Sequence, residues 1–274
     1  MLNQDLPVKR PLLTYFGGKF ALAPWILDHL PPHRVYVEPF GGAGSVLLRK
    51  PRSPVEIYND LDGEIVNLFR VVQDPTLARA LFKRIRRTPY ARAEYEQTRH
   101  QSGGTPVDRA VRVIVRSHMS FNAAALFEKS IPFSCTKHKN GGKSRAAEWA
   151  NYPRHLASIT ARLRGVMIEN RPAAEVIERQ DSPGTLFYVD PPYLPATRSS
   201  GRYRCDLTPA DHRALLEQLK TVQGMVVLSG YPSRLYDELL PDWQRIDRPA
   251  RAANSARRRT ECLWLNPRAS TLRP

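Results

Sequence analysis

The sequence predicts an α/β protein built around a mainly parallel sheet. Short apolar runs of strand length alternate along the chain with segments of helical character, which is the pattern of strands joined by helical crossovers. Turn-forming glycines or prolines follow several of these runs directly. The chain has 274 residues, of which 42% are hydrophobic, so it can bury a substantial core. The expected strands are 35–37, 55–58, 185–189, 226–228 and 262–265.

The first motif, Tyr15-Phe16-Gly17-Gly18-Lys19, precedes the first expected strand. A Gly-Gly pair followed by lysine resembles a fragment of a phosphate-binding P-loop, but the full G-x-x-x-x-G-K-[ST] pattern is absent and Phe20 follows the lysine. Phosphate binding is therefore disfavoured. We expect Lys19 to pair with a carboxylate instead, and Tyr15 to pack beside a ligand.

Glycines follow the strand at 35–37, in the run Glu38-Pro39-Phe40-Gly41-Gly42-Ala43-Gly44. They let the chain turn tightly and let a ligand approach the backbone, as in nucleotide-binding α/β folds. Because the spacing differs from G-x-G-x-x-G, a dinucleotide site is disfavoured.

The next strand, 55–58, ends at Asn59-Asp60. In nucleotide-binding α/β folds, an acid at the tip of the second strand hydrogen-bonds ribose hydroxyls. Asp60 would equally suit the N-cap of the helix that we expect to start near Leu61. Both interpretations stay open on local grounds.

The most informative motif is Asp190-Pro191-Pro192-Tyr193, directly behind the apolar run 185–189. Two prolines without N–H groups make a stiff corner whose carbonyls and carboxylate face outward. The Asp190 carboxylate and the Pro191 carbonyl can each accept one hydrogen of an exocyclic amino group on a nucleobase, and Tyr193 can stack on the base. The alternative interpretation is a solvent-exposed proline turn with an aspartate cap.

Positive charge is concentrated between the second expected strand and the strand at 185–189. The formal net charge is +16, and residues 74–164 hold 18 Lys and Arg against 6 Asp and Glu, or +12 of that excess. This indicates nucleic acid or another anionic surface as a partner. We expect helices at Pro75–Arg87 and Thr105–His118, and a basic hairpin in Glu128–Arg145 around Asn140-Gly141. The expected DNA contacts are Arg112, Arg116, Lys129, Lys137, Lys139, Asn140 and Lys143; a solvated basic face is the alternative for the helical charges.

The remaining signals are structural. Thr208-Pro209-Ala210-Asp211 has the hydroxyl, proline and acid of a helix start. His212 is interpreted as structural rather than catalytic, because no Ser or Cys nucleophile pattern accompanies it. The three cysteines, Cys135, Cys205 and Cys262, have no C-x-x-C spacing, so we expect neither a metal site nor a disulfide framework.

The sequence shows no signal peptide and no apolar stretch of membrane-spanning length, and we expect a cytoplasmic protein in a bacterial or phage-infected cell.

In their order along the chain, these motifs resemble the Dam-type, alpha-group DNA adenine-N6 methyltransferases, including phage-like members. That family runs Y/W-x-G-G-K, E-P-F-x-G-x-G, a recognition insert and D-P-P-Y, and this chain shows the same order. The resemblance implies a Rossmann-like class I methyltransferase sheet with an inserted, mainly helical target-recognition domain that carries a β-hairpin. The implied insert is 73–164, and 1–72 and 165–274 form the two parts of a catalytic domain that binds S-adenosylmethionine.

The resemblance also implies a reaction and residue roles. The expected reaction is site-specific transfer of a methyl group from S-adenosylmethionine to N6 of an adenine flipped out of double-stranded DNA, by a monomer without a metal. The residues matched to the cofactor are Tyr15, Lys19, Glu38, Phe40, Gly41, Gly42, Gly44, Asp60 and Asp190. The catalytic corner is Asp190, Pro191, Pro192 and Tyr193. Where some relatives carry an acid that supports the cofactor's adenine, this chain has Arg171-Pro172.

Two alternatives belong to other function classes. A methyltransferase of the same fold could act on cytosine N4 or on RNA, although relatives that act on cytosine N4 usually carry serine in place of Asp190. The chain could also be a DNA-binding protein that has lost catalysis. The presence of Lys19, Asp60 and Asp190 counts against that second interpretation.

Overall fold

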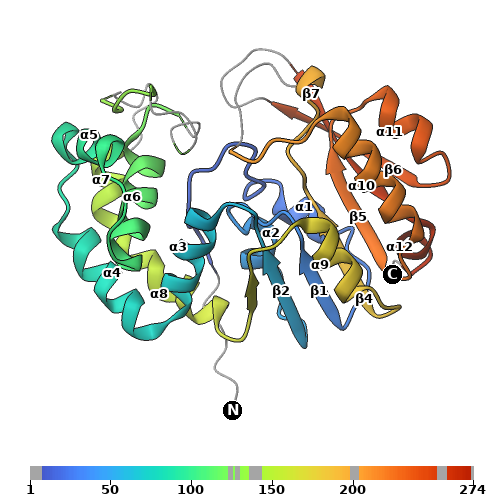
Figure 1. The fold of residues 1–274 in the computed structure, drawn as a ribbon, viewed down its shortest axis with the longest axis horizontal. Coiled ribbons are helices and arrows are strands. Elements are labelled where there is room, and N and C mark those ends of the chain that lie inside the picture. The colour runs from blue at the N-terminus through green and yellow to red at the C-terminus, as the bar shows by residue number, and fades with distance from the viewer. Residues whose placement is uncertain are drawn as a thin grey trace.

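A central sheet carries helices on both faces, and a further group of helices lies at one end of it (Figure 1). The computed structural model describes residues 8–122, 126, 130–135, 144–197, 204–251 and 258–272. This architecture confirms the α/β class expected from the sequence. Within these residues, no helix has both the length and the apolar character needed to cross a membrane.

Seven strands form the sheet in the described part of the chain, in the order β3-β2-β1-β4-β5-β7-β6. Neighbours from β3 to β5 are parallel, and β7 and β6 are added antiparallel. The order reverses at β1, which pairs with both β2 and β4, and the carboxyl ends of strands at such a reversal form a crevice for ligands. The strands are β1 (Val35–Glu38), β2 (Val55–Asn59), β3 (Met167–Glu169), β4 (Thr185–Val189), β5 (Met225–Gly230), β6 (Gln244–Arg251) and β7 (Arg258–Leu265).

Side chains of the central strands alternate between two hydrophobic clusters, one on each face of the sheet. Tyr36 and Tyr188 belong to the first cluster, and Val37 and Phe187 to the second. Burial on both faces explains why the strands read as continuous apolar runs. The first face packs against α1 (Ala23–Leu27), α2 (Ser45–Arg49), α3 (Gly63–Gln73) and α12 (Pro267–Thr271), and the second against α9 (Ala173–Gln180), α10 (Pro209–Thr221) and α11 (Arg234–Leu239). A 3-10 turn, Pro195–Thr197, follows the Asp190 corner.

Within the described residues, the chain between β2 and β3 is mainly helical. After α3 come α4 (Pro75–Arg87), α5 (Arg92–His100), α6 (Pro106–Met119), α7 (Arg145–Asn151) and α8 (Pro153–Leu163), seen as the helix group on the left of Figure 1. Their buried residues continue the first hydrophobic cluster of the sheet. The predicted helix 75–87 is confirmed, and the predicted helix at 105–118 begins one residue later because Thr105 is its N-cap in a capping box with Asp108.

The expected basic hairpin falls mostly outside the described residues. Lys129, Lys137, Lys139, Asn140 and Lys143 all lie there, so their predicted contacts to DNA stay predictions. On the described flank, an antiparallel bridge joins Ser120 to Phe133.

A buried group of three charges fastens α8 to β2. Glu56 on β2 accepts from Lys50 Nζ at 2.7 Å and from both terminal nitrogens of Arg162 on α8, at 2.6 and 2.8 Å. The three side chains, which we name the Glu56 cluster, are each 4% exposed or less. The Lys50 ammonium also donates to Pro51 O and Ser53 Oγ. Both carboxylate oxygens and the ammonium therefore have protein partners, whereas Arg162 Nε has none among the described residues.

Candidate active site

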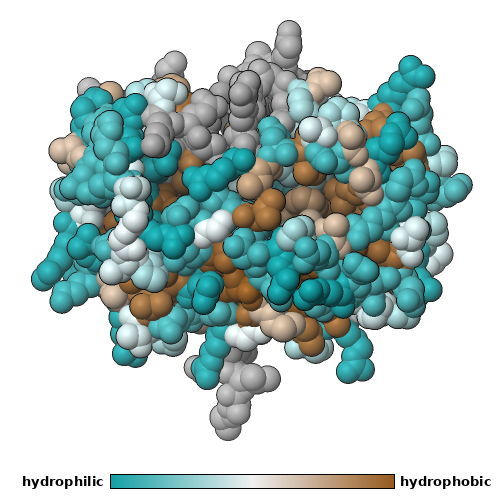
Figure 2. All heavy atoms as spheres, in the orientation of Figure 1, coloured by the Kyte–Doolittle hydropathy of each residue, from teal (hydrophilic) through white to brown (hydrophobic). Residues whose placement is uncertain are grey.

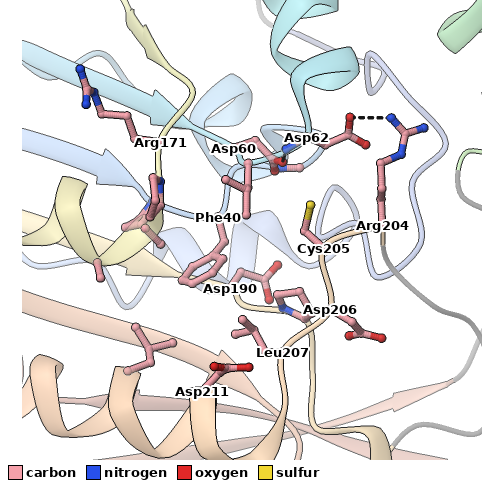
Figure 3. A pocket seen from close by; sticks show the side chains of 18 of the residues that line it. Phe40, Asp60, Asp62, Arg171, Asp190, Arg204, Cys205, Asp206, Leu207 and Asp211 are labelled. Carbon is pink, nitrogen blue, oxygen red and sulfur yellow. Dashed lines mark hydrogen bonds and ion pairs between the residues drawn. The ribbon is translucent and has the colours of Figure 1, made fainter.

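The carboxyl ends of β1 and β4 open onto a cavity of about 390 Å³. That volume lies in the range of small-molecule sites, roughly 300–1,000 Å³. Hydrophobic residues gather near the middle of the face shown in Figure 2, whereas most of the surrounding surface is hydrophilic. Figure 3 shows Asp60 and Asp62 on one side of the cavity, Leu207 and Asp211 on the other, and Phe40 and Asp190 between them.

The glycine loop after β1 lets the cavity reach the backbone. Gly42 and Gly44 have φ values of +48° and +59°, a region that residues with a side chain rarely adopt. Gly41 lies against Tyr58, where an added Cβ would be 2.2 Å from the ring. The Tyr58 hydroxyl donates to Gly42 O at 2.6 Å, which braces the loop. A larger residue in this loop would therefore displace either the loop or the ring.

Asp60 holds the same loop from the tip of β2. Its carboxylate accepts from Gly42 N at 2.7 Å and from Asp62 N at 2.8 Å. Burial raises the pKa of Asp60 to about 6, although the backbone N–H donors oppose this. The interpretation of Asp60 as the N-cap of the following helix is wrong, because Asp62 caps α3 by accepting from Glu64 N at 2.9 Å. Asp60 is therefore a cavity residue.

Three charged side chains from distant segments meet behind the Asp190 corner. Lys19 Nζ lies 3.0 Å from Asp190 Oδ1 and 3.6 Å from Oε1 of Glu261 on β7. We name Lys19, Asp190 and Glu261 the Asp190 cluster. The expected pairing of Lys19 with a carboxylate is confirmed. Burial raises the pKa of Asp190 and Glu261 adds to this, while the Lys19 charge opposes it.

The Tyr193 ring is packed rather than loose. Its hydroxyl donates to Glu261 Oε1, Lys19 Nζ lies 4.6 Å from the ring centre, and Tyr231 packs edge-on at 4.6 Å between ring centroids. The exposed-turn interpretation of the Asp190 corner is wrong, because Tyr193 is only 8% exposed and the Asp190 side chain 18%. Pro192 lines the cavity beside Asp190.

Glu38 ends β1 and holds the start of α2. Its Oε1 accepts from the Tyr36 hydroxyl at 2.7 Å and from Leu47 N, in the first turn of α2, at 2.6 Å. Burial raises the pKa of Glu38 to about 7, against the lowering effect of these two donors. Glu38 also lines a smaller cavity of about 40 Å³, together with Tyr15, Lys19 and Asp190.

Arg204 lines the cavity and joins parts of the site that are far apart in the sequence. Its Nη1 lies 3.0 Å from Asp62 Oδ1 (Figure 3). Its Nη2 donates to Leu126 O at 3.4 Å. It thus links the chain after the Asp190 corner to the cap of α3 and to the segment that follows α6. Asp62 and Arg204 were not expected as site residues, because neither lies in the glycine loop or the proline corner and no local pattern links the two.

Two of the residues expected to contact DNA, Arg112 and Arg116, lie in the described part of the chain. Both are on α6 and half-buried. Arg112 donates to Gly103 O. Burial lowers the pKa of Arg116, whose neighbours include Tyr95 and Arg204. Their side chains therefore already contact protein groups, and their role toward DNA stays a prediction.

His212 lies outside the site, whereas Cys205 lines its cavity (Figure 3). His212 is buried, and its Nδ1 is 3.0 Å from the Tyr236 hydroxyl, which fits the structural interpretation. Cys135, Cys205 and Cys262 are free thiols. In the part of the chain that the structure describes, no group of three or more His, Cys, Asp or Glu side chains is placed to hold a metal ion.

Comparison with known proteins agrees with this geometry. Residues 15–253 match the family described as D12 class N6 adenine-specific DNA methyltransferase. The chain is 28% identical over 229 residues to the DNA adenine methylase of Escherichia coli (strain K12), covering 79% of this chain and 77% of the relative. It is 26% identical over 252 residues to the DNA adenine methylase of Serratia marcescens, covering 85% and 86%. It is 26% identical over 202 residues to that of Vibrio cholerae (strain O395), covering 70% and 68%. Since the family match spans most of the sequence, the chain belongs to the D12 class N6 adenine-specific DNA methyltransferase family.

Proposed function

We propose that the protein transfers a methyl group from S-adenosylmethionine to N6 of an adenine flipped out of double-stranded DNA. The observation that carries the proposal is the position of Asp190: a partly buried acceptor in a proline corner, lining a cavity that is bounded by a glycine loop and Asp60. Family membership supports the reaction, and the arrangement of these groups supports the residue roles.

The cavity has the chemistry that a cationic nucleoside requires. Its lining includes five aspartates and two arginines, so its charge is net negative, which favours a sulfonium cation. Gly42 brings the backbone to the cavity wall, and Phe40 offers an apolar ring. When bound, S-adenosylmethionine supplies the methyl group as an electrophile. In this proposal Asp60 accepts hydrogen bonds from the ribose hydroxyls. Lys19 and Glu38 contribute indirectly, because Lys19 pairs with Asp190 and Glu38 holds the start of α2. The residues assigned to the cofactor are Tyr15, Lys19, Glu38, Phe40, Gly41, Gly42, Gly44, Asp60 and Asp190.

Asp190 and Pro191 accept hydrogen bonds from the adenine amino group. The N6 lone pair is delocalised into the ring, and two acceptors in the corner turn it outward toward the electrophile. Tyr193 contributes its ring face to the base, and Pro192 stiffens the corner. Asp190 takes the N6 proton as the new C–N bond forms, and its raised pKa suits that transfer. Alignment of these groups and their fixed charges contribute more than basicity alone.

The helices between β2 and β3 bind the duplex in this proposal. Residues 73–164 form the target-recognition insert, and 1–72 and 165–274 the catalytic domain. The excess of Lys and Arg in this segment supports the assignment. Each phosphate neutralised adds about 0.9 to the slope of log K against log salt, so binding should weaken steeply with salt. The assigned contacts are Arg112, Arg116, Lys129, Lys137, Lys139, Asn140 and Lys143.

The test is to incubate the purified protein with S-adenosylmethionine labelled in the methyl group and with mixed-sequence duplex DNA. The DNA is digested to nucleosides, and a parallel sample is sequenced for modified positions. Label in N6-methyldeoxyadenosine supports the proposal and identifies the target sequence. Label in N4-methyldeoxycytidine would contradict the assigned base, and DNA binding without label would favour a binding protein that has lost catalysis.

A further inference from the structure

Glu261 is a buried carboxylate for which the proposed function assigns no role. It lies on β7, opposite Arg248 in the register with β6, and is 4% exposed. It also lies beyond the segment, 15–253, that matches the family. A charged residue on a buried strand loses its hydration, so its effect on stability and on the site depends on its protein partners.

Both partners of Glu261 belong to the catalytic corner or touch it. Its Oε1 accepts from the Tyr193 hydroxyl and lies 3.6 Å from Lys19 Nζ. The same ammonium lies 3.0 Å from Asp190 Oδ1 and donates to Gly17 O at 2.8 Å. Glu261 thus contacts Tyr193 and Lys19, which lie beside the acceptor Asp190. It does not line the cavity itself.

The charge balance explains why a second carboxylate matters. With Lys19 alone, Asp190 would form a neutral pair, and the ammonium would draw electron density from the oxygens that must accept the N6 hydrogens. Glu261 shares the ammonium, so the three groups carry a net charge of −1. Electrostatic effects between such groups are strong in a low-dielectric interior.

Tyr193 adds a steric reason. The ring is held at its hydroxyl by Glu261 and packed edge-on by Tyr231. Two fixed ends leave the ring little freedom to turn. Loss of the acceptor at Glu261 would free the hydroxyl and let the ring move beside the corner.

We propose that Glu261 is a positioning residue for methyl transfer, which holds the Tyr193 hydroxyl and shares the Lys19 ammonium so that Asp190 remains a strong acceptor for adenine N6. This inference rests on the proposed function.

The pH profile reports the charge role directly. The titratable groups that act on Asp190 are Lys19, Glu38, Tyr188, Tyr193, Tyr236 and Glu261. Glu261 raises the pKa of Asp190, so Glu261→Gln should lower it. Because transfer requires the ionised carboxylate, the acid limb of the single-turnover rate should move to lower pH in Glu261→Gln.

The experiment compares Glu261→Gln, Glu261→Asp and Tyr193→Phe with wild type and with Glu238→Gln, a control that removes an exposed carboxylate on α11. Single-turnover methyl transfer is measured against pH, and S-adenosylmethionine and DNA binding are measured separately. In Glu261→Gln we expect the transfer rate to fall on the order of 10- to 100-fold, with binding of both ligands retained. Glu261→Asp keeps the charge and should restore the wild-type acid limb with part of the rate. Tyr193→Phe keeps Glu261 but removes a hydroxyl whose hydrogen bond lowers the pKa of Asp190, so it should lose rate and move the acid limb to higher pH, opposite to Glu261→Gln.

The outcomes separate the inference from the function on which it rests. Wild-type protein that methylates no DNA would overturn both. Active wild type, with Glu261→Gln matching it in rate and acid limb, would overturn the inference alone. If circular dichroism shows that Glu261→Gln is unfolded, Glu261→Asp and Tyr193→Phe decide. Wild-type rates in both would overturn the positioning role. A loss of rate in both, with the wild-type acid limb retained in Glu261→Asp, would support it.

Discussion

The Glu56 cluster and the Asp190 cluster each hold three charged side chains, but their net charges have opposite sign. The Glu56 cluster places two cations around one carboxylate, and the Asp190 cluster places two carboxylates around one cation. Burial by itself raises the pKa of Glu56, but Arg162 and Lys50 lower it below its ordinary value, whereas the pKa of Asp190 stays raised. The first cluster is sealed, while Asp190 is 18% exposed and lines both cavities.

The difference shows that burial of charge does not by itself mark a catalytic site. In the Glu56 cluster both carboxylate oxygens have protein partners and every side chain is 4% exposed or less, so the carboxylate reaches no ligand. In the Asp190 cluster the carboxylate faces a cavity. A functional cluster differs from a structural one in having an acceptor that reaches a ligand.

The largest expected effect is on catalysis at Asp190. Asp190→Ala removes the acceptor for N6 and should reduce methyl transfer by at least about 100-fold, while binding of duplex DNA by fluorescence anisotropy is retained. The matched control is Asp242→Ala, which removes an exposed aspartate away from the cavity. Methyl transfer at the wild-type rate in Asp190→Ala would contradict the acceptor role.

Next comes stability at Glu56. Glu56→Gln leaves two buried cations without their carboxylate and should lower the free energy of unfolding by about 3–5 kcal/mol. Because the pKa of Glu56 is lowered in the folded state, its contribution is present above the ordinary glutamate pKa and is lost as pH falls through the folded value. Urea denaturation at neutral and acidic pH measures both effects.

The control for Glu56 is the same substitution at an exposed ion pair. Glu238→Gln should change the free energy of unfolding by no more than about 0.5 kcal/mol. Equal denaturation midpoints for Glu56→Gln and wild type would show that the Glu56 cluster is not structural.

A smaller effect is expected for the pair of Arg204 and Asp62 at the cavity. The Arg204 side chain is 45% exposed, and such pairs contribute up to about 1 kcal/mol. Arg204→Ala should therefore lower the free energy of unfolding by no more than about 1 kcal/mol, measured by urea denaturation. Arg234→Ala, which breaks an ion pair on α11, is the control. A free energy of unfolding equal to that of wild type would show that the Arg204–Asp62 pair does not stabilise the fold.

The smallest expected effect is on the stability of the Asp190 cluster, which we compare with that of the Glu56 cluster. An acid whose pKa is raised by folding opposes folding at pH values above its folded pKa, and the cost disappears as pH falls below it. Asp190→Asn removes this cost and should raise Tm at neutral pH by no more than roughly 4 °C. The gain should vanish in acid. A lower Tm for Asp190→Asn at neutral pH would mean that the Asp190 cluster stabilises the fold, as the Glu56 cluster does.

Much of the fold followed from short stretches of sequence. The helix at 75–87 was predicted at its observed bounds because Asp74, its N-cap, and Pro75, its first residue, are neighbours. Asp60 shows where local reasoning fails. Asp60 and Asp62 are both good N-cap residues, and only the positions of Gly42 and Glu64 decided which carboxylate caps α3.

The sequence by itself determined five of the seven described strands, the starts of α4 and α10, the glycine loop and the proline corner, because each depends on residues within a few positions of one another. The strands β3 and β6 were not predicted. The order β3-β2-β1-β4-β5-β7-β6 was decided only in the tertiary structure. That order brings Lys19, Asp190 and Glu261 together from three distant segments, and it places Arg162 beside Glu56. Charge balance at a buried site depends on partners that meet only when the sheet has formed, so no local pattern can encode it.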